Sequence, residues 1–296
     1  MKIWILLDKK DEPFHQYENK QLLSVISEAE IVYASEFEIV VNREDEKGII
    51  YEDLRVDLPD VVIPRTGSRT TYFTLAVIRH LEKLGSWVLN PADSINKAKD
   101  KLETFQLLSA QKLPIPKTVL GKFPIDPNII EKELSYPFVL KKISGSSGKG
   151  VLLVKKHQQF EDLLGLIEEE NSRMNLIFQE FISHSAGQDL RVFVVGGRAI
   201  GAMKRTGKAG DFRSNFSAGG SAENFELNPE IEWLAVEAAR AVGLEIAGVD
   251  ILFGENDEIF VCEVNANPGF EGFEGATGVN VAGEIYSFVK LKSSQF

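Results

Sequence analysis

Three oxygen-bearing side chains lie close together in the stretch 247–270, and their types fit a site for a hard metal cation. Two apolar runs flank a turn-forming tetrapeptide there, which predicts an antiparallel hairpin. A two-residue turn at 256–257 would set Asp250 opposite Glu263, and Asn265 would share a face with Glu263. Carboxylate and amide oxygens suit Mg²⁺ or Mn²⁺, and a cation would relieve the repulsion between the two acids. The alternative is an ordinary hairpin with solvated acids.

A run of small residues, Ser144–Gly150, is a second candidate for chemistry. Backbone N–H groups can approach an anion closely there, which predicts a phosphate cradle that includes Ser146 and Gly148. The run is not a Walker loop, because its lysine is followed by glycine and it joins two predicted strands. It would act as a flap over phosphates, with Lys141 or Lys142 reaching from the preceding strand. A glycine-rich hairpin without a ligand is the alternative.

Clustered arginines are conspicuous in a chain whose formal net charge is −11. The run Lys204–Asn215 contains four cations, and the fork of Arg205 or Arg213 suits a carboxylate or a phosphate. Arg65 and Arg69 follow a predicted strand, at the end of the strand where open α/β sheets place ligands. Solvent-exposed basic loops are the alternative in both places.

The predicted strand Ile177–Ile182 is a candidate for base binding. Its backbone could pair with an adenine edge while Phe178 and Phe181 supply apolar walls, although a plain interdomain strand has the same pattern. Asp189 and Arg191 share a face of the next strand, where a surface ion pair would contribute little. The four histidines show no spacing typical of a metal site or a Ser-His-Asp arrangement.

Composition limits the possible classes of protein. The chain has 296 residues, 44% of them hydrophobic, which allows one large domain or a few small ones. Its single cysteine, Cys262, excludes an internal disulfide and predicts a cytoplasmic location. The acidic balance argues against nucleic acid as a partner. No apolar run approaches the roughly 20 residues that span a bilayer, so neither export nor a membrane partner is expected.

The elements that must position these side chains divide the chain into three predicted parts. Residues 1–92 alternate short strands and helices, which predicts an α/β unit with a parallel sheet. Residues 93–182 begin with one helix, capped by Asp93 or Ser94 and running to about Lys112, and continue as an α+β module with the flap. Residues 183–296 are richer in hairpins and include the candidate metal site.

The order of these features resembles the ATP-grasp ligases, and most closely the RimK-type family of glutamate ligases. The matching strings are KDKLETFQLL, KKISGSSGKG, QEFI, GQDLR, GDFRSN, AGVDIL and EVNANPGFEGFEGATG, in order from about residue 60 to residue 290. The resemblance implies an ATP-grasp fold preceded by a Rossmann-like pre-ATP-grasp domain. Phe181 stands where tyrosine is common in that family, and Lys149 stands in the flap where an apolar residue is usual.

The same resemblance implies a role for each matching residue. Lys101 and Lys141 would contact ATP phosphates, and Glu180 and Phe181 would hold adenine. The residues Asp250, Glu263 and Asn265 would hold two Mg²⁺ or Mn²⁺ ions. The residues implied for ATP binding are Lys101, Lys141, Glu180, Phe181, Asp189, Arg213, Ser214 and Asn215.

The implied reaction is ATP-dependent ligation of a carboxylate to an amine. A carboxylate attacks the γ-phosphate of ATP, and an amine then displaces phosphate from the acyl phosphate. Lys141 would offset the charge on the phosphates, and Arg191 and Arg205 are the residues expected to stabilise the intermediate.

The expected substrates are L-glutamate and an acceptor carboxylate on a protein C-terminus or a small molecule, and relatives suggest a homo-oligomer. Other acceptors, such as an amino-group carrier protein, a deazaflavin coenzyme or N-acetylaspartate, remain open, as does another amino acid. A nucleotide-binding regulator without turnover is the alternative from a different class.

Overall fold

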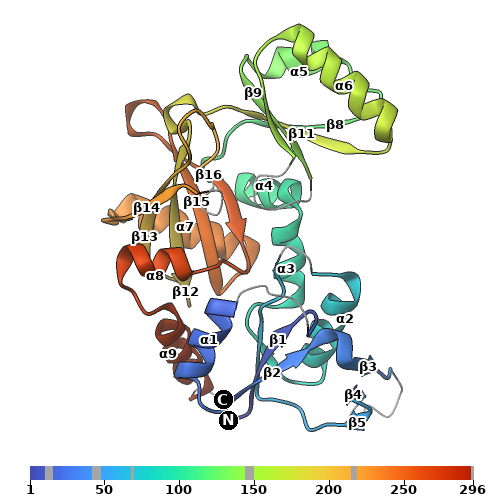
Figure 1. The fold of residues 1–296 in the computed structure, drawn as a ribbon, viewed down its shortest axis with the longest axis vertical. Helices are drawn as coiled ribbons and strands as arrows, with labels where there is room; N and C mark the ends of the chain where they lie inside the picture. Colours follow the sequence, from blue (N-terminus) through green and yellow to red (C-terminus); the bar gives the residue numbers. More distant parts are fainter. Residues whose placement is uncertain (11–15, 42–47, 68–69, 144–149, 215–218, 295–296) are drawn as a thin grey trace.

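The chain folds into three parts, each of which contains at least one β-sheet (Figure 1). This computed structural model describes residues 1–10, 16–41, 48–67, 70–143, 150–214 and 219–294. The N-terminal and C-terminal parts lie side by side, the central part projects from them, and the two chain ends lie close together (Figure 1). Within the described ranges, every helix is too short or too polar to cross a membrane.

The N-terminal part is built on a parallel sheet with the strand order β2-β1-β6-β7. A second, antiparallel sheet, β3-β4-β5, lies at its edge. The elements are β1 (Ile3–Leu7), α1 (Gln16–Val25), β2 (Ala29–Tyr33), β3 (Phe37–Ile39), β4 (Ile49–Tyr51), β5 (Leu54–Arg55), β6 (Val61–Pro64), α2 (Tyr72–Lys83) and β7 (Trp87–Val88).

Two helices, α3 (Ala92–Lys99) and α4 (Lys101–Ala110), replace the single helix predicted from Asp93. The prediction was wrong because Asp100 has an extended backbone (φ −90°, ψ 105°) and caps α4. Its carboxylate accepts hydrogen bonds from the backbone N–H groups of Leu102 and Glu103. Neither Asp93 nor Ser94 caps α3, whose N-cap residue is Pro91. The break makes Lys101 the first residue of α4.

The central part is an antiparallel sheet of order β10-β9-β11-β8 with two helices against it (Figure 1). Phe138, Phe160 and Phe178 meet edge to face in its core, with ring centroids 5.0 to 6.2 Å apart. The elements are β8 (Thr118–Lys122), α5 (Pro127–Glu133), β9 (Phe138–Lys142), β10 (Val151–Val154), α6 (His157–Asn171) and β11 (Asn175–Glu180).

The C-terminal part is a five-stranded antiparallel sheet of order β14-β13-β12-β15-β16. Its strand β14 and helix α8 were not predicted, because neither shows a clear hydrophobic period. The elements are β12 (Gln188–Val195), β13 (Arg198–Thr206), β14 (Ser221–Phe225), α7 (Pro229–Val242), β15 (Ile246–Phe253), β16 (Ile259–Asn265), α8 (Glu271–Thr277) and α9 (Val281–Ser293).

The β15–β16 hairpin reaches the predicted pairing of Asp250 with Glu263 by a different route. Ile251 pairs with Val261, so the same register would set Asp250 opposite Cys262. The register shifts by one residue next to Asp250, and this β-bulge sets Asp250 opposite Glu263. The predicted two-residue turn is wrong, because a 3₁₀ turn connects the strands.

Two buried clusters join the parts of the chain to one another. Phe105 and Leu108 of α4 pack with Leu234 of α7, so α4 belongs to the core of the C-terminal sheet although the predicted boundary at residue 93 grouped it with the central part. A second cluster joins Ile5 of β1 to Phe193 of β12. The N-terminal and C-terminal parts therefore share apolar cores, which holds their relative position.

The capping role of Asp100 can be measured directly. We expect Asp100→Ala to lower the free energy of unfolding by about 1 kcal/mol, because two backbone N–H groups of α4 lose their acceptor. Asp93→Ala is the matched control, because the Asp93 side chain is 76% exposed and makes only a surface ion pair with Lys97. Urea denaturation measures both, and equal losses would contradict the assignment of the cap.

Candidate active site

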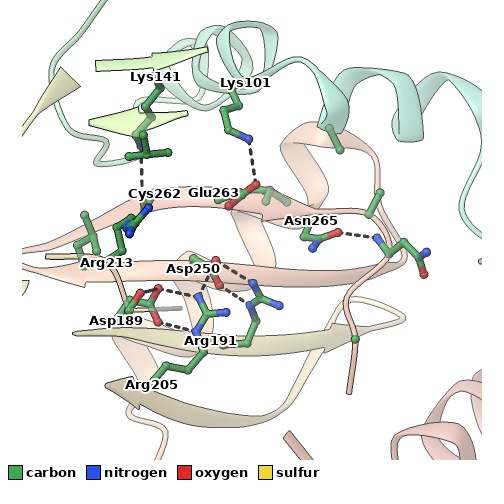
Figure 2. A pocket seen from close by; sticks show the side chains of 18 of the residues that line it. Lys101, Lys141, Asp189, Arg191, Arg205, Arg213, Asp250, Cys262, Glu263 and Asn265 are labelled. Carbon is green, nitrogen blue, oxygen red and sulfur yellow. Dashed lines mark hydrogen bonds and ion pairs between the residues drawn. The ribbon is translucent and has the colours of Figure 1, made fainter. Parts of the chain in front are cut away.

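A cavity of about 670 Å³ lies where the three parts of the chain meet. The central part contributes Lys141 and Gln179, the C-terminal sheet contributes Asp189 and Asp250, and the N-terminal part contributes Thr66. The lysines reach in from one side and the charged residues of the C-terminal sheet lie on the other (Figure 2). The cavity is thus large enough for a substantial ligand and is lined by both signs of charge.

Four largely buried charges form one network on the wall of this cavity (Figure 2). Asp189 lies directly across from Arg205, and Arg191 directly across from Asp250, on neighbouring strands. Arg191 donates from Nε and Nη2 to the two oxygens of Asp250, the second at 2.8 Å. The Nη2 of Arg205 lies 2.6 Å from Asp189 Oδ2 and 2.8 Å from Asp250 Oδ2. The charges cancel within the network, which makes their burial tolerable.

This network corrects the prediction of a surface ion pair between Asp189 and Arg191. Each of the two residues pairs with a residue on the neighbouring strand instead, and both are less than 9% exposed. The hydroxyl of Ser214 also donates to Asp189. Asp189 is thus held by Arg205 and Ser214.

The network shifts the two carboxyl groups in opposite directions. Burial would raise the pKa of Asp250, but the attraction of Arg191 and Arg205 outweighs burial and lowers that pKa. Burial, together with the charge of Asp250, raises the pKa of Asp189, because Arg205 and Ser214 offset only part of the effect. Asp250 therefore stays ionised to lower pH, as a metal ligand must.

Asp250, Glu263 and Asn265 lie on the cavity wall as predicted, and their oxygens fit a hard cation. A carboxylate has about four lone-pair positions, and the two arginines use three on Asp250, which leaves one for a cation. Lys101 Nζ lies 3.2 Å from Glu263 Oε1. Among the described residues no group of three or more His, Cys, Asp or Glu could hold a metal, so this set depends on the amide of Asn265.

The two predicted phosphate-binding lysines reach the cavity from different elements. Lys141 lies on β9, is 9% exposed, and its Nζ donates to Gln179 Oε1 at 2.6 Å. Lys101 lies on the first turn of α4, beside Glu263. Lys101 and Lys141 lie across the cavity from the carboxylates of the C-terminal sheet (Figure 2). Lys142 also lines the cavity, and the combined positive charge would attract a polyphosphate.

The predicted adenine-binding residues divide between the cavity and the core. Glu180 and Phe181 line the cavity, and the Phe181 ring lies 6.1 Å from that of Phe212. Phe178 is fully buried in the core of the central part, so the prediction that it forms a wall was wrong. Cys262 lies on the cavity wall next to Lys141, and burial raises the pKa of its thiol.

The predicted arginine and flap residues have different outcomes. Arg213 lines the cavity and pairs with Asp211, whereas Ser146, Gly148, Asn215 and Arg69 lie outside the described residues. Arg65 is 3% exposed and does not line the cavity. Its Nη2 donates to Pro268 O at 3.0 Å, so the structure places Arg65 behind the wall and not in contact with a substrate.

Sequence reasoning missed three residues at the end of the cavity formed by the N-terminal part. Glu18 and Lys99 line this end. No motif singles out Glu18, and the string KDKLETFQLL begins with Lys99 but assigned it no role. Asn90, buried behind the wall, bonds to backbone more than 150 residues away in the chain. Its only signal in the sequence was its place before Pro91 at a strand end.

Comparison with known proteins agrees with this fold and site. Residues 98–289 match the RimK-like ATP-grasp domain, and residues 1–95 match the RimK pre-ATP-grasp domain. A probable alpha-L-glutamate ligase of Legionella pneumophila (strain Corby) is 38% identical over 79% of this chain and 77% of its own length. A protein of the same description from Thioalkalivibrio sulfidiphilus is 40% identical over 78% of this chain and 76% of its own length.

Solved structures show the same fold. The ATP-grasp ligase PsnB complexed with minimal precursor superimposes with a TM-score of 0.76 at 20% identity, over 98% of this chain and 99% of that one. D-alanine–D-alanine ligase from Bacillus anthracis superimposes with a TM-score of 0.68 at 17% identity, over 100% of both chains. The fold and the family match define an ATP-dependent ligase of the ATP-grasp class. Within that class, the chain belongs to the RimK-like family, as the sequence motifs predicted.

Removing one member of the buried charge network should be far more costly than removing an exposed arginine. We expect Arg205→Ala to lower the free energy of unfolding by about 3–5 kcal/mol, because two buried carboxylates lose a shared partner. Arg213→Ala should cost less than about 1 kcal/mol, since its side chain is 41% exposed. Urea denaturation measures both changes, and similar losses would show that the network does not stabilise the sheet.

The single cysteine reports on the cavity without any engineered label. Because burial raises the pKa of Cys262, we expect slow alkylation by iodoacetamide at pH 8 and a rate that still rises above pH 9. ATP at 100 times its Kd should slow alkylation about 100-fold if the occupied cavity excludes the reagent. Mass spectrometry follows the adduct, with urea-unfolded protein as control. Equal rates with and without ATP would place the nucleotide elsewhere.

Proposed function

We propose that this ligase attaches L-glutamate, through its amino group, to a carboxylate of an acceptor. The observation that carries the proposal is the single cavity in which Lys101 and Lys141 face Asp250, Glu263 and Asn265. The names of the curated relatives, probable alpha-L-glutamate ligases, support glutamate as the amino acid.

The chemistry takes place in two steps. An oxygen of the acceptor carboxylate attacks the γ-phosphorus of ATP, and the bond to ADP breaks, which gives an acyl phosphate and ADP. The amine of glutamate then attacks the acyl carbon, inorganic phosphate leaves, and the amine loses a proton. Neither step needs a nucleophile from the protein. The work of the side chains is to bind, to orient and to stabilise charge.

The positive side chains have separate tasks in this scheme. Lys141, held by Gln179, and Lys101, held beside Glu263, lie where they can bind phosphate oxygens. Arg191 and Arg205 line the cavity from the C-terminal sheet and would stabilise the acyl phosphate. Glu180 and Phe181 also line the cavity and would hold the adenine base.

Asp250, Glu263 and Asn265 would hold Mg²⁺ or Mn²⁺, as a pair of ions. Such ions would neutralise charge between the phosphates of ATP. A PsnB structure described as complexed with Mg and ADP supports magnesium with a nucleotide in this fold. The remaining lone-pair position on Asp250 and the cross-strand pairing with Glu263 support the same assignment.

The acceptor would enter at the end of the cavity formed with the N-terminal part. Thr66, Gly67 and Lys99 line the cavity there, as do Asn267 and Gly269 of the loop that Arg65 contacts at Pro268. PsnB is described as complexed with a precursor peptide, which supports a protein segment as one class of acceptor alongside small carboxylic acids. The expected cytoplasmic location, consistent with a single free cysteine, and the expected homo-oligomer belong to the same proposal.

The test is phosphate release with each of the twenty amino acids against a panel of peptide and small-molecule carboxylates. We expect release to depend on ATP, on one acceptor class and on glutamate, and Glu263→Ala to lose activity at least about 10²-fold. Glu258→Ala changes an exposed acid directly before the strand that carries Glu263, and should retain full activity.

The outcomes of this screen separate the proposals. Full activity in Glu263→Ala would refute the metal assignment, and release with another amino acid would refute glutamate. If no pair of substrates gave turnover while ATP still protected Cys262, the chain would be a nucleotide-binding regulator.

A further inference from the structure

Three side chains of the N-terminal part hold the backbone directly after the candidate metal ligand Asn265. The Nδ2 of Asn90 donates to Ala266 O at 2.9 Å, and the Nη2 of Arg65 donates to Pro268 O at 3.0 Å. The carboxylate of Glu18 accepts from Phe270 N at 2.8 Å. Asn90, Arg65 and Glu18 are only 2%, 3% and 6% exposed. Alternate residues of the loop 266–270 are therefore anchored from outside the C-terminal part.

Asn90 links the two strands that carry the candidate metal ligands. Its Nδ2 also donates to Ile246 O at 2.7 Å, and its Oδ1 accepts from Glu245 N at 2.8 Å and Ile246 N at 2.9 Å. Both donors and both acceptor positions of the amide are thus in use. One side chain holds the start of β15, which carries Asp250, and the loop that follows β16.

The anchored loop in turn orients the side chain of Asn265. The backbone N–H of Asn267 donates to Asn265 Oδ1 at 2.9 Å. Asn90 holds the carbonyl of Ala266, which belongs to the same peptide group as this N–H, and Arg65 holds the carbonyl of Pro268, the next residue along the chain. The direction of the amide oxygen therefore follows from contacts made by the N-terminal part. The second lone pair of that oxygen is left for a cation.

Cohesion between the parts does not require these polar groups. Apolar residues of β1 and β12 already join the two parts in a shared core. Arg65 instead buries a guanidinium, and burial lowers its pKa to about 10. Its Nε has no hydrogen-bond partner among the described residues. A buried charge of this kind stabilises the fold less than an apolar group of the same volume would. We therefore attribute to Arg65 the role of fixing the geometry of the loop 266–270.

We propose that Glu18, Arg65 and Asn90 are positioning residues that orient Asn265 toward the cation of the bound nucleotide. This inference rests on the proposed function, because it takes Asp250, Glu263 and Asn265 as the metal ligands. The N-terminal part then contributes to metal binding and also forms a wall of the proposed acceptor site.

The test is Mn²⁺ binding to the full chain in the presence of ADP, followed by electron paramagnetic resonance. We expect Glu18→Ala and Arg65→Met to weaken Mn²⁺ binding about tenfold, the lower end of the range for residues that orient metal ligands. Glu18→Gln should stay within about twofold of the wild type, because its amide oxygen still accepts from Phe270 N. Rescue by glutamine separates the hydrogen bond from the charge.

Two controls distinguish a loss of Asn265 orientation from a general loosening of the interface between the N-terminal and C-terminal parts. Tyr17→Phe removes the 2.7 Å hydrogen bond from Tyr17 to Glu274 across the same interface but keeps the ring that packs edge to face against Phe270, and should leave Mn²⁺ binding unchanged. Binding of ADP without metal, measured by equilibrium dialysis, should be unchanged in every variant, because its candidate contacts lie in the central and C-terminal parts. If Arg65→Met fails to fold, the Glu18 pair decides the question.

The inference is refuted if Glu18→Ala binds Mn²⁺ as tightly as the wild type, or if Tyr17→Phe loses as much affinity. If the proposed function itself is wrong, a different result is expected. The wild type would then show no nucleotide-dependent Mn²⁺ binding, or Glu263→Ala would not abolish that binding.

Discussion

The pairing of two carboxylates with two guanidinium groups inside the C-terminal sheet is the constraint on which the site depends. Asp189 and Asp250 lie on neighbouring strands, both nearly buried, and would repel each other without partners. Each lies directly across from an arginine on the neighbouring strand. The pairing register of β12, β13 and β15 therefore also determines which charges compensate each other. A slip of one residue would turn these charges into the apolar core. The ion pairs that make the burial of the two carboxylates tolerable thus also determine where the charged groups of the site lie.

A single β-bulge adds the remaining acid to this arrangement. It moves Glu263 into the place opposite Asp250 that Cys262 would otherwise take. Lys101 then approaches Glu263 from α4, which is packed in the core of the same sheet. The break at Asp100 determines where α4 begins and therefore where Lys101 lies. Two local irregularities thus add Glu263 and Lys101 to the four charges that the regular strand register brings together.

The fold was predictable where a strong local pattern coincided with a buried face. The amphipathic helix α7, with Asn228 as its cap, and the strands β9 and β12 follow this rule. The short strands β4 and β5 were missed because two or three residues cannot establish a period, and β14 was missed because its sequence SAENF shows no clear hydrophobic period. The single helix predicted across Asp100 failed because the hydrophobic pattern continues through a residue whose carboxylate caps a new helix.

The sequence by itself determined the types of chemistry present: oxygen ligands at Asp250, Glu263 and Asn265, cations at Lys101 and Lys141, and family motifs that define an ATP-dependent ligase. Those signals are local, since each depends on residue types within a few positions. Only the tertiary structure decided that Arg191 pairs with Asp250 and that Arg205 is shared between Asp189 and Asp250. It also decided that Arg65 lies behind the wall of the cavity and not in it. These outcomes depend on strand register and on contacts across more than 150 residues, such as those of Asn90, which no local pattern encodes.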